Sequence, residues 1–240
     1  EAGKINFEAH MAMRDAVRPG VATIELDAIA AQVIKRHGAT PAFLGYPPGS
    51  RHPFPAVVTV CINEELVHGI PGKRVLKEGD IVTLDCGTEY KGYVGDSAYT
   101  WPVGKISVEA EHLLRVTEDS LTEAISKCVV GNRLGDVSHA VESFVARFGF
   151  TVPREYGGHG VGRQMHEDPH IPNWGEPGKG IQLRRGMTFA VEPMVMMGQR
   201  DLMVLNDHWT VVPKDRKLCA HFEHTIAVTD DGPDVLTRFD

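Results

Sequence analysis

The stretches EGDIVTLD at 78–85 and RGMTFAVE at 185–192 follow the same plan. Each has a turn glycine, then an apolar run that favours a strand, and then an acidic residue. Two helix-like segments, at 24–36 and 137–145, also match each other, because each has apolar residues at helical spacing and is followed by a glycine suited to a C-terminal cap. Together these matches indicate an internal repeat.

The repeat predicts how the chain is divided. The matching helices are 111 residues apart (26 to 137) and the matching strands 107 residues apart (85 to 192), a difference that a four-residue change in loop length would produce. We therefore expect one domain over 1–240, built from two structurally similar halves at about 1–105 and 106–240. The alternative is a chance similarity between two helix-and-strand units.

The remaining segments predict the fold class. A third, longer helix is expected to begin near Ser107, which suits an N-cap position. Strands and helices do not alternate as a doubly wound parallel sheet requires. The fold class is therefore α+β, with an antiparallel sheet. Its strands are expected at 56–62, 80–86, 93–100, 187–197, 202–205, 209–212 and 221–229.

The composition excludes several classes of protein. With 25 Lys and Arg against 32 Asp and Glu, the formal charge is −7, and there is no long basic run, so we expect no direct binding to nucleic acid or anionic lipid. The longest apolar runs have about six residues, far below the roughly 20 that span a bilayer. The sequence begins without a secretory signal pattern. Four scattered cysteines without a CxxC pair are typical of reduced thiols and favour a cytoplasmic location.

Two aspartates lie close together in the predicted hairpin. Asp85 ends an apolar strand and Asp96 begins the return strand. If Tyr90 and Lys91 form a two-residue turn, the aspartates are directly opposite each other, with Cβ atoms about 5 Å apart. Like charges at that distance require a shared proton or a cation between them. The alternative is a pair of solvated surface aspartates.

Two glutamates lie inside otherwise apolar strands. Glu192 is in FAVEPM and Glu223 is in FEHTIAV, and neither strand contains Lys or Arg. Buried glutamates are rare without a partner. One metal centre would satisfy all four acids, whereas separate salt bridges would each need a distant base.

His159 is the fifth candidate ligand. It is enclosed by glycines in GGHGVG, which allow close backbone approach and leave the imidazole free to face a site. A nucleotide-binding loop is the alternative, but the following MHEDP segment predicts no helix to hold a phosphate. Four carboxylates and one imidazole exceed a closed structural zinc site. They suit two divalent metal ions, such as Mn, Fe(II), Co or Zn.

The segments around these residues resemble the type I methionine aminopeptidases, whose fold is named after pita bread. The similarity extends over nearly the whole chain, and the five candidate ligands keep the family's order. The matching segments are Asn63 to Pro71 (NEELVHGIP), Asp80 to Gly87, Gly95 to Ser97, Gly158 to Pro169 (GHGVGRQMHEDP), Gly186 to Val195 (GMTFAVEPMV) and Phe222 to Asp230 (FEHTIAVTD).

The resemblance implies an activity and a role for each ligand. The family removes the initiator methionine from nascent proteins and prefers a small second residue. Asp85 would hold the first metal alone, Asp96 and Glu223 would bridge, and His159 and Glu192 would complete the second. A metal-bridging hydroxide would attack the scissile carbonyl, with Glu192 as the proton acceptor.

The resemblance also implies the residues that contact the substrate. His68 and His166 match two family histidines beside the scissile amide, where they stabilise the tetrahedral intermediate. Relatives often have Cys at the positions of Phe43 and Thr59 and Phe at the position of Met165, and loop 47–55 is longer here than in well-known members. We therefore expect a methionine pocket of altered shape. Its residues are Phe43, Tyr46, Phe54, Thr59, Met165 and Trp209.

Two other functions remain as alternatives. One is an Xaa-Pro aminopeptidase or dipeptidase of the same superfamily, which usually carries an additional N-terminal domain. The other is a catalytically inactive binding relative, which would be expected to have lost ligands. The resemblance implies nascent-chain N-termini as substrates and transient association with ribosomes, and no oligomeric interface is visible, so we expect a monomer. Several other histidines are interpreted as surface residues without chemistry, namely His10, His37, His52, His112 and His139.

Overall fold

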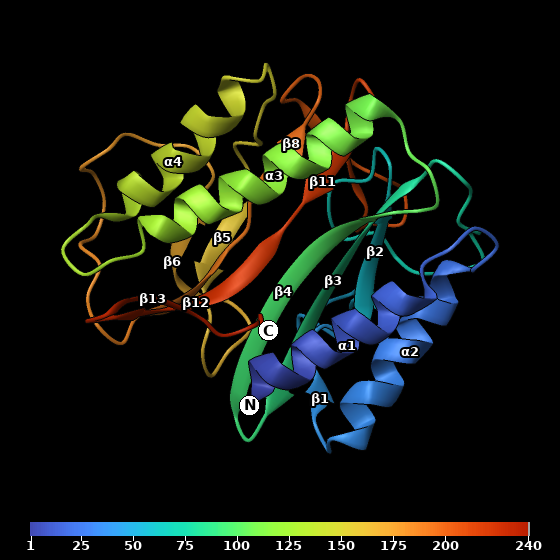
Figure 1. The fold of residues 1–240 in the computed structure, drawn as a ribbon. Helices are drawn as coiled ribbons and strands as arrows, with labels where there is room; N and C mark the ends of the chain where they lie inside the picture. The colour runs from blue at the N-terminus through green and yellow to red at the C-terminus, as the bar shows by residue number, and fades with distance from the viewer. Residues whose placement is uncertain (240) are drawn as a thin grey trace.

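The computed structural model describes residues 1–239 and contains four α-helices and thirteen β-strands (Figure 1). The helices are α1 (Ala2–Ala16), α2 (Thr23–Arg36), α3 (Val108–Ser126) and α4 (Leu134–Ala146). The strands are β1 (Thr40–Pro41), β2 (Val58–Ile62), β3 (Ile81–Tyr90), β4 (Tyr93–Pro102), β5 (Gly157–Gly160), β6 (Glu167–Pro172), β7 (Thr188–Val191), β8 (Met194–Met196), β9 (Leu202–Val204), β10 (Val211–Pro213), β11 (Cys219–His221), β12 (Glu223–Thr229) and β13 (Gly232–Val235).

Nine strands form one curled sheet. Its order is β1-β3-β4-β12-β7-β5-β6, with β2 also paired to β3 and β13 to β12. The pairings between named strands are antiparallel, as are the separate pairs β9–β10 and β8–β11. The α+β prediction with an antiparallel sheet is therefore confirmed.

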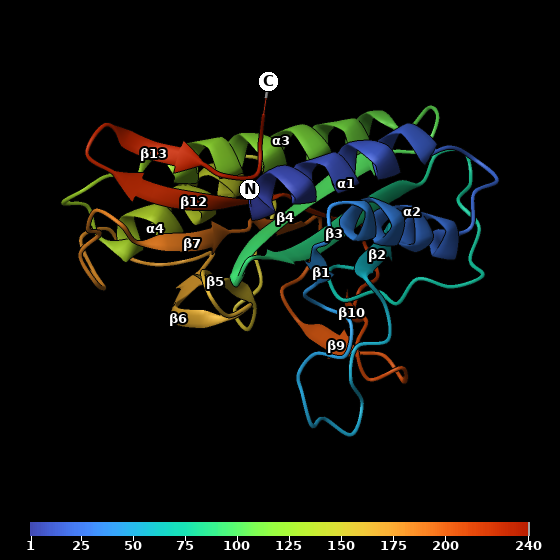
Figure 2. The same ribbon diagram turned by 90° about the horizontal axis from the view of Figure 1, so that it is seen from below.

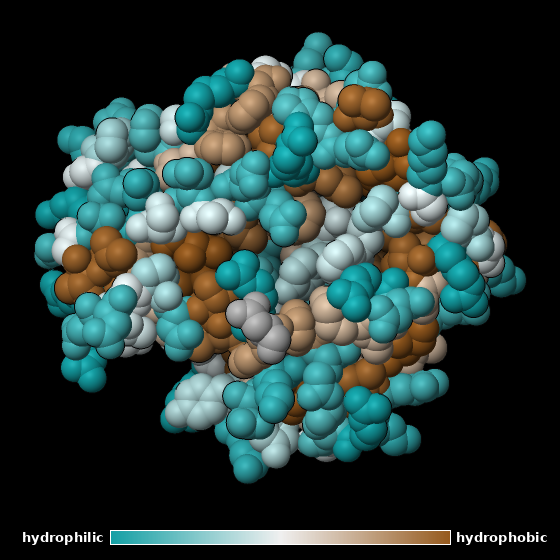
Figure 3. Space-filling model, viewed as in Figure 1, coloured by the Kyte–Doolittle hydropathy of each residue, from teal (hydrophilic) through white to brown (hydrophobic). Residues whose placement is uncertain are grey.

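The helices cover one face of the sheet. Figure 2 shows α1 and α3 above it, while β9, β10 and the loop near 45–55 project from the opposite side. On the helical side, hydrophilic side chains are interspersed with several separate groups of apolar ones (Figure 3). No helix of residues 1–239 is long and apolar enough to cross a membrane.

Two buried clusters hold the helices to the sheet. The first contains Leu26 and Val33 of α2 together with Leu84 of β3. The second contains Val137 and Val141 of α4 together with strand residues of the other end of the sheet. Burial of this kind of apolar surface contributes on the order of 25 cal/mol per Å². The helix patterns read from the sequence thus correspond to core-facing stripes.

The helix ends agree with the capping residues that the sequence indicated. Gly38 follows α2 with φ of 66°, and Gly149 follows α4 with φ of 77°, a backbone region that glycine adopts at little cost. The hydroxyl of Ser107 accepts a hydrogen bond from the backbone N–H of Ala110, so the expected N-cap of α3 is confirmed.

Helix α1 corrects the interpretation of His10 as a surface residue. His10 is completely buried, and its Nε2 lies 2.8 Å from the carbonyl oxygen of Ser97. Asn6 also faces the sheet and donates to the carbonyl of Gly95 at 3.2 Å. Because these polar side chains alternate with Ile5 and Ala9 on the buried side, the apolar stripe of this helix is interrupted.

The β3–β4 hairpin corrects the expected register. Asp85 pairs with Ala98 and Asp96 pairs with Gly87, so the aspartates are diagonal neighbours and the expectation that they are directly opposite was wrong. The turn residues are Lys91 and Gly92, both with positive φ, as a type I′ turn requires. Since the register differs by two residues, both carboxylates still lie on one face of the sheet.

Several strand boundaries also differ from the expectation. The predicted strand 187–197 is two strands separated by Glu192 and Pro193, because proline cannot donate a ladder hydrogen bond. β1, β5, β6 and β13 were not predicted. In β5 the reason is its composition: a Cβ on Gly158 would lie 2.2 Å from the carbonyl oxygen of Ala190, so close packing against β7 demands glycine there.

Candidate metal centre and active-site cleft

The five candidate ligands come from five consecutive positions in the central sheet. Asp85 is on β3, Asp96 on β4, Glu223 on β12, Glu192 directly after β7 and His159 on β5. These strands are neighbours in the order β3-β4-β12-β7-β5. All five residues are buried. Residues up to 138 positions apart (85 to 223) are therefore brought together on one face.

The histidine of this group faces the carboxylates. His159 Nε2 lies 3.6 Å from Asp96 Oδ2 and 3.7 Å from Glu192 Oε1. Its other ring nitrogen, Nδ1, is 2.9 Å from the carbonyl oxygen of Gly160. A hydrogen on Nδ1 would be donated to that carbonyl, which leaves Nε2 with a free lone pair toward the acids.

Two groups of side chains have the spacing of metal ligands. One consists of Asp96, His159 and Glu223, and the other of Glu192, His221 and Glu223. Within each group the candidate ligand atoms lie within 4.8 Å of one another. Glu223 belongs to both, so two sites could share one carboxylate.

The unpaired oxygens of the acids fit a cation. Among the described residues, Asp85 Oδ1, Asp96 Oδ1 and Glu223 Oε1 are buried and have no hydrogen-bond partner. Burial raises the pKa of Asp85 to about 7 and holds the pKa of Asp96 and of Glu223 well above the usual range, and the neighbouring carboxylates add to these shifts. Such a group must bind protons or cations. The donor set of carboxylates and imidazole suits divalent metals.

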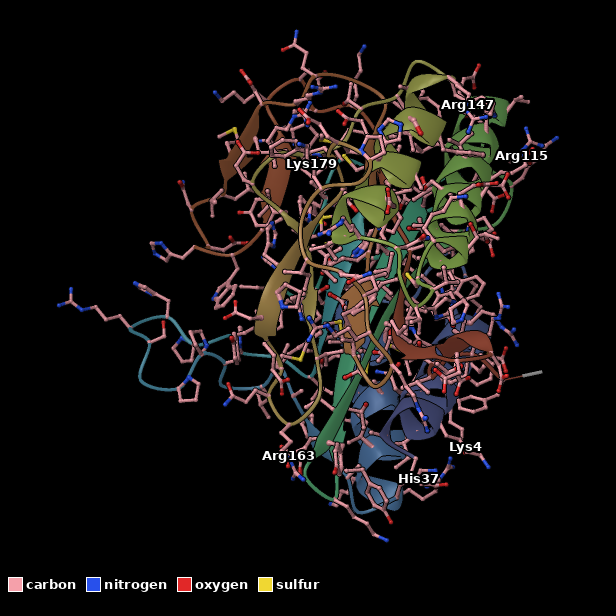
Figure 4. The ribbon with its side chains drawn as sticks, turned by 90° about the vertical axis from the view of Figure 1, so that its left-hand side faces the viewer. Lys4, His37, Arg115, Arg147, Arg163 and Lys179 are labelled. Atoms are coloured by element: carbon pink, nitrogen blue, oxygen red, sulfur yellow. The ribbon has the colours of Figure 1, made fainter. Side chains whose placement is uncertain are left out.

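Basic side chains do not neutralise these acids. The ion pairs that involve them within residues 1–239 are to histidines. Figure 4 shows Lys4, Arg115, Arg147 and Arg163 at the periphery of the molecule, away from the middle of the sheet. The negative charge of the four carboxylates is therefore not compensated by Lys or Arg within residues 1–239.

His166 and His68 line the cleft beside this group. The ring of His166 lies 4.3 Å from that of His159, and its Nδ1 is 2.7 Å from the hydroxyl of Tyr46. His68 has φ of 62° and its ring contacts Trp209 at 6.0 Å between centroids. Loss of surrounding water lowers the pKa of both, that of His68 to about 4. Both imidazoles are therefore neutral near pH 7 and can donate hydrogen bonds.

The cleft has one polar and one apolar wall. A cavity of about 300 Å³ is lined by all thirteen residues that the sequence predicted for the site. Phe54 packs edge-on against Phe43 at 6.4 Å and against Trp209 at 5.2 Å between centroids. The apolar wall is completed by Tyr46, Thr59 and Met165, and it suits an unbranched apolar side chain.

Loop 47–55 is joined to the far rim of the cleft. The indole N–H of Trp209 donates to the carbonyl of His52 at 3.1 Å. The rings of His52 and His208 are stacked with centroids 4.0 Å apart. Figure 2 shows this loop beside β9 and β10 on the side of the sheet away from the helices.

Several cleft residues were missed by the sequence analysis. Glu155, Tyr156, His170 and Met194 also line the cavity. His221 is almost completely buried behind the acids, with its Nε2 3.4 Å from Glu192 Oε2. A signal for it existed, because residues two apart on a strand share a face and Glu223 follows it by two.

Comparisons with known proteins agree with this geometry. The model of the metallopeptidase family M24 matches residues 1–230. Methionine aminopeptidase 1 of Bacillus subtilis is 51% identical over 238 residues, which cover 99% of this chain and 94% of the relative. Methionine aminopeptidase 1 of Mycobacterium tuberculosis is 47% identical and has 90% of its length covered.

Solved structures give the same result for the fold. The methionine aminopeptidase of Thermotoga maritima superposes with a TM-score of 0.96 at 44% identity, over 99% of this chain and 94% of that one. The prolidase of Pyrococcus horikoshii, at 21% identity and with 60% of its chain covered, shares only the fold, with a TM-score of 0.78. The pita-bread fold is therefore confirmed. The chain belongs to metallopeptidase family M24 and, within it, to the methionine aminopeptidases.

Proposed function

We propose that this protein is a metal-dependent aminopeptidase that removes the initiator methionine from nascent proteins and prefers a small second residue. The observation that carries the proposal is a cleft with a buried group of four carboxylates and one imidazole on one side and an apolar wall on the other. The first feature supplies the hydrolytic centre, and the second suits the methionine side chain.

The five ligands would hold two divalent metal ions, with Mn, Fe(II), Co and Zn as candidates. Asp85 would serve the first site, Asp96 and Glu223 would be shared, and His159 and Glu192 would complete the second. When bound, such ions act as Lewis acids and make water a nucleophile at neutral pH. The unpaired buried oxygens of Asp85, Asp96 and Glu223 support this assignment.

The protein's own groups would position the substrate and move its protons. His68 and His166, neutral and on the rim of the cleft, would donate hydrogen bonds to the scissile amide and stabilise negative charge as it develops on the carbonyl oxygen. Glu192 would accept the proton of the attacking water, and burial raises the pKa of this carboxyl group, which strengthens it as a base.

The apolar wall would select the first residue of the substrate. Phe54 and Trp209 form an aromatic corner, and the thioether of Met165 lies in the same cavity. A linear thioether side chain adapts to such irregular apolar space. We further propose nascent-chain N-termini as substrates, transient contact with ribosomes, a cytoplasmic location, a monomeric state and a single catalytic domain with halves near 1–105 and 106–240.

The test uses protein stripped with a chelator and then titrated with Mn, Co, Fe(II) or Zn. We expect metal-dependent release of methionine from Met-Ala-Ser, no cleavage of Ala-Pro-Ala, and loss of activity in His159→Ala. Cleavage of the prolyl peptide instead would assign the Xaa-Pro specificity. Inactivity with every metal would leave a binding protein as the function.

A further inference from the structure

We propose that His221, which lies outside the five-ligand set, is a positioning residue for the metal centre. It would donate a hydrogen bond from Nε2 to Glu192 and so fix which carboxylate oxygen faces the metal. The inference rests on the proposed function, because that function gives Glu192 its role as a ligand.

The two oxygens of Glu192 face two different histidines. Oε1 lies 3.7 Å from Nε2 of His159, whereas Oε2 lies 3.4 Å from Nε2 of His221. His159 lines the cavity and His221 lies behind it. The carboxylate is therefore held between a histidine on its cavity side and a second histidine on its protein side.

Strand geometry places His221 on the same face as the acids. His221 pairs with Met194 between β11 and β8, and His224 pairs with Val191 between β12 and β7. Since both pairs have the same residue sum, the register continues through the intervening residues and sets Glu223 across from Glu192. Side chains two apart share a face, so His221 is the diagonal neighbour of Glu192.

The backbone of His221 is fixed by a threonine of β4. Its N–H donates to the Thr100 hydroxyl oxygen at 2.9 Å, and that hydroxyl donates to the carbonyl of His221 at 2.8 Å. Because its N–H and its carbonyl both bind the Thr100 side chain, the backbone of His221 is fixed, and with it the position from which the imidazole extends. A ligand carboxylate needs this kind of rigid outer support.

Among the described residues, the ring nitrogens of His221 lack hydrogen-bond partners, and the carboxylates of the site are acceptors that Nε2 could reach. Neither ring nitrogen of His221 has a hydrogen-bond partner within residues 1–239, although the side chain is almost fully buried. Nε2 lies 3.4 Å from a carboxylate oxygen of Glu192 and 3.9 Å from one of Glu223. Both are acceptors, so a hydrogen on Nε2 is the tautomer that suits them. A shift of a few tenths of an ångström would complete the bond to Glu192.

The test compares variants that keep or remove the donor. We expect His221→Ala to weaken Mn(II) binding about 10- to 100-fold, the usual effect of losing an outer-shell partner. His221→Gln keeps an N–H donor and should stay within about fivefold of the wild type by the same reasoning. Binding is measured by calorimetry or by the electron paramagnetic resonance of free Mn(II). His10→Ala, which removes another buried histidine, is the matched control and should leave the dissociation constant unchanged.

Three results would overturn the proposal. The first is an unchanged Mn(II) affinity in His221→Ala, and the second is an equal loss of Mn(II) affinity in His221→Ala and His221→Gln. The third is the loss of a coordinated-nitrogen signal from the Mn(II) spectrum of His221→Gln, which would make His221 a direct ligand. If the Ala variant does not fold, His221→Leu fills the space without a donor and replaces it. Failure of the proposed function is distinguishable, since wild-type protein would then bind no Mn(II) or His159→Ala would bind it normally.

Discussion

The hydroxyl of Tyr46 lies 2.7 Å from Nδ1 of His166, in the cleft that the carboxylates also line. When the hydroxyl donates this bond, the hydrogen of the neutral imidazole is on Nε2. His166 then presents a hydrogen-bond donor to the cleft, and its tautomer is set by Tyr46, a residue that the sequence placed only in the methionine pocket.

Replacing Tyr46 with Phe removes the hydroxyl that sets the tautomer of His166 and keeps the aromatic ring. We expect kcat/KM for Met-Ala-Ser to fall about tenfold, equivalent to about 1.4 kcal/mol of transition-state stabilisation. Mn(II) affinity should not change. Tyr93→Phe is the matched control, because it removes a hydroxyl that accepts a hydrogen bond from the exposed Arg163. A fall in kcat/KM of equal size in both variants would exclude the proposed role.

Replacing Asp96 with Asn should affect stability in opposite directions with and without metal. Burial and the neighbouring Asp85 raise the pKa of Asp96, so ionisation above pH 4 favours the unfolded state and wild-type stability falls as pH rises. In chelator at pH 8, Asp96→Asn should therefore be more stable than the wild type. With Mn(II) at 100 times its dissociation constant, the wild type gains about 2.7 kcal/mol and the order reverses. Denaturant melts under both conditions provide the check, and lower stability of the variant in chelator would contradict the prediction.

Replacing His10 with Gln should reduce acid sensitivity. Burial lowers the pKa of His10 to about 4, so the unfolded state binds a proton that the folded state rejects between pH 6.5 and 4. The contribution of His10 to the free energy of unfolding is therefore complete above pH 6.5 and is lost as the pH falls toward 4. Between pH 7.5 and 5 this amounts to about 2 kcal/mol, which His10→Gln should remove. The free energy of unfolding is measured in chelator at both pH values. His139→Gln, at an exposed histidine, should behave as the wild type.

Replacing Gly158 with Ala should disturb the candidate metal centre by displacing β5. The added Cβ would lie 2.2 Å from the carbonyl oxygen of Ala190, so β5 must move away from β7 and carry His159 with it. We expect a loss of about 1–3 kcal/mol in stability, typical of overpacking, together with weaker Mn(II) binding. In Gly72→Ala, a Cβ meets no heavy atom within 4 Å, so thermal melts of that variant should match the wild type. A Gly158→Ala protein with normal stability and normal metal affinity would contradict the packing argument.

The residues that line the cleft could be predicted from the sequence better than the geometry that brings them together. Glu192 and Glu223 stood out because each is an acid inside an apolar strand. Such a strand is expected to be buried, and a buried acid is rare without a partner. The hairpin register could not be obtained in the same way. It depends on Lys91 adopting a φ of 51°, a left-handed conformation for which lysine has no particular preference.

The missed elements have physical reasons of their own. β5 consists of Gly157–Gly160, and a glycine-rich segment carries no strand propensity even where close packing forces it to be extended. His221 could have been found from its spacing to Glu223, but a histidine in a strand is common enough that only the distance to Glu192 gives it meaning. Contacts between residues far apart in sequence decided both cases.

The place of β12 in the sheet also determines when the centre can exist. β12 lies between β4 and β7, yet it begins at residue 223 of 240. During synthesis the middle position of the sheet therefore stays vacant until β12 has been made, and until then β4 and β7 have no partner at that edge. Fragments that end before Glu223 lack the carboxylate common to both candidate ligand groups. Assembly of the candidate metal centre is thus coupled to the synthesis of β12, because this strand both fills the middle of the sheet and supplies the shared carboxylate.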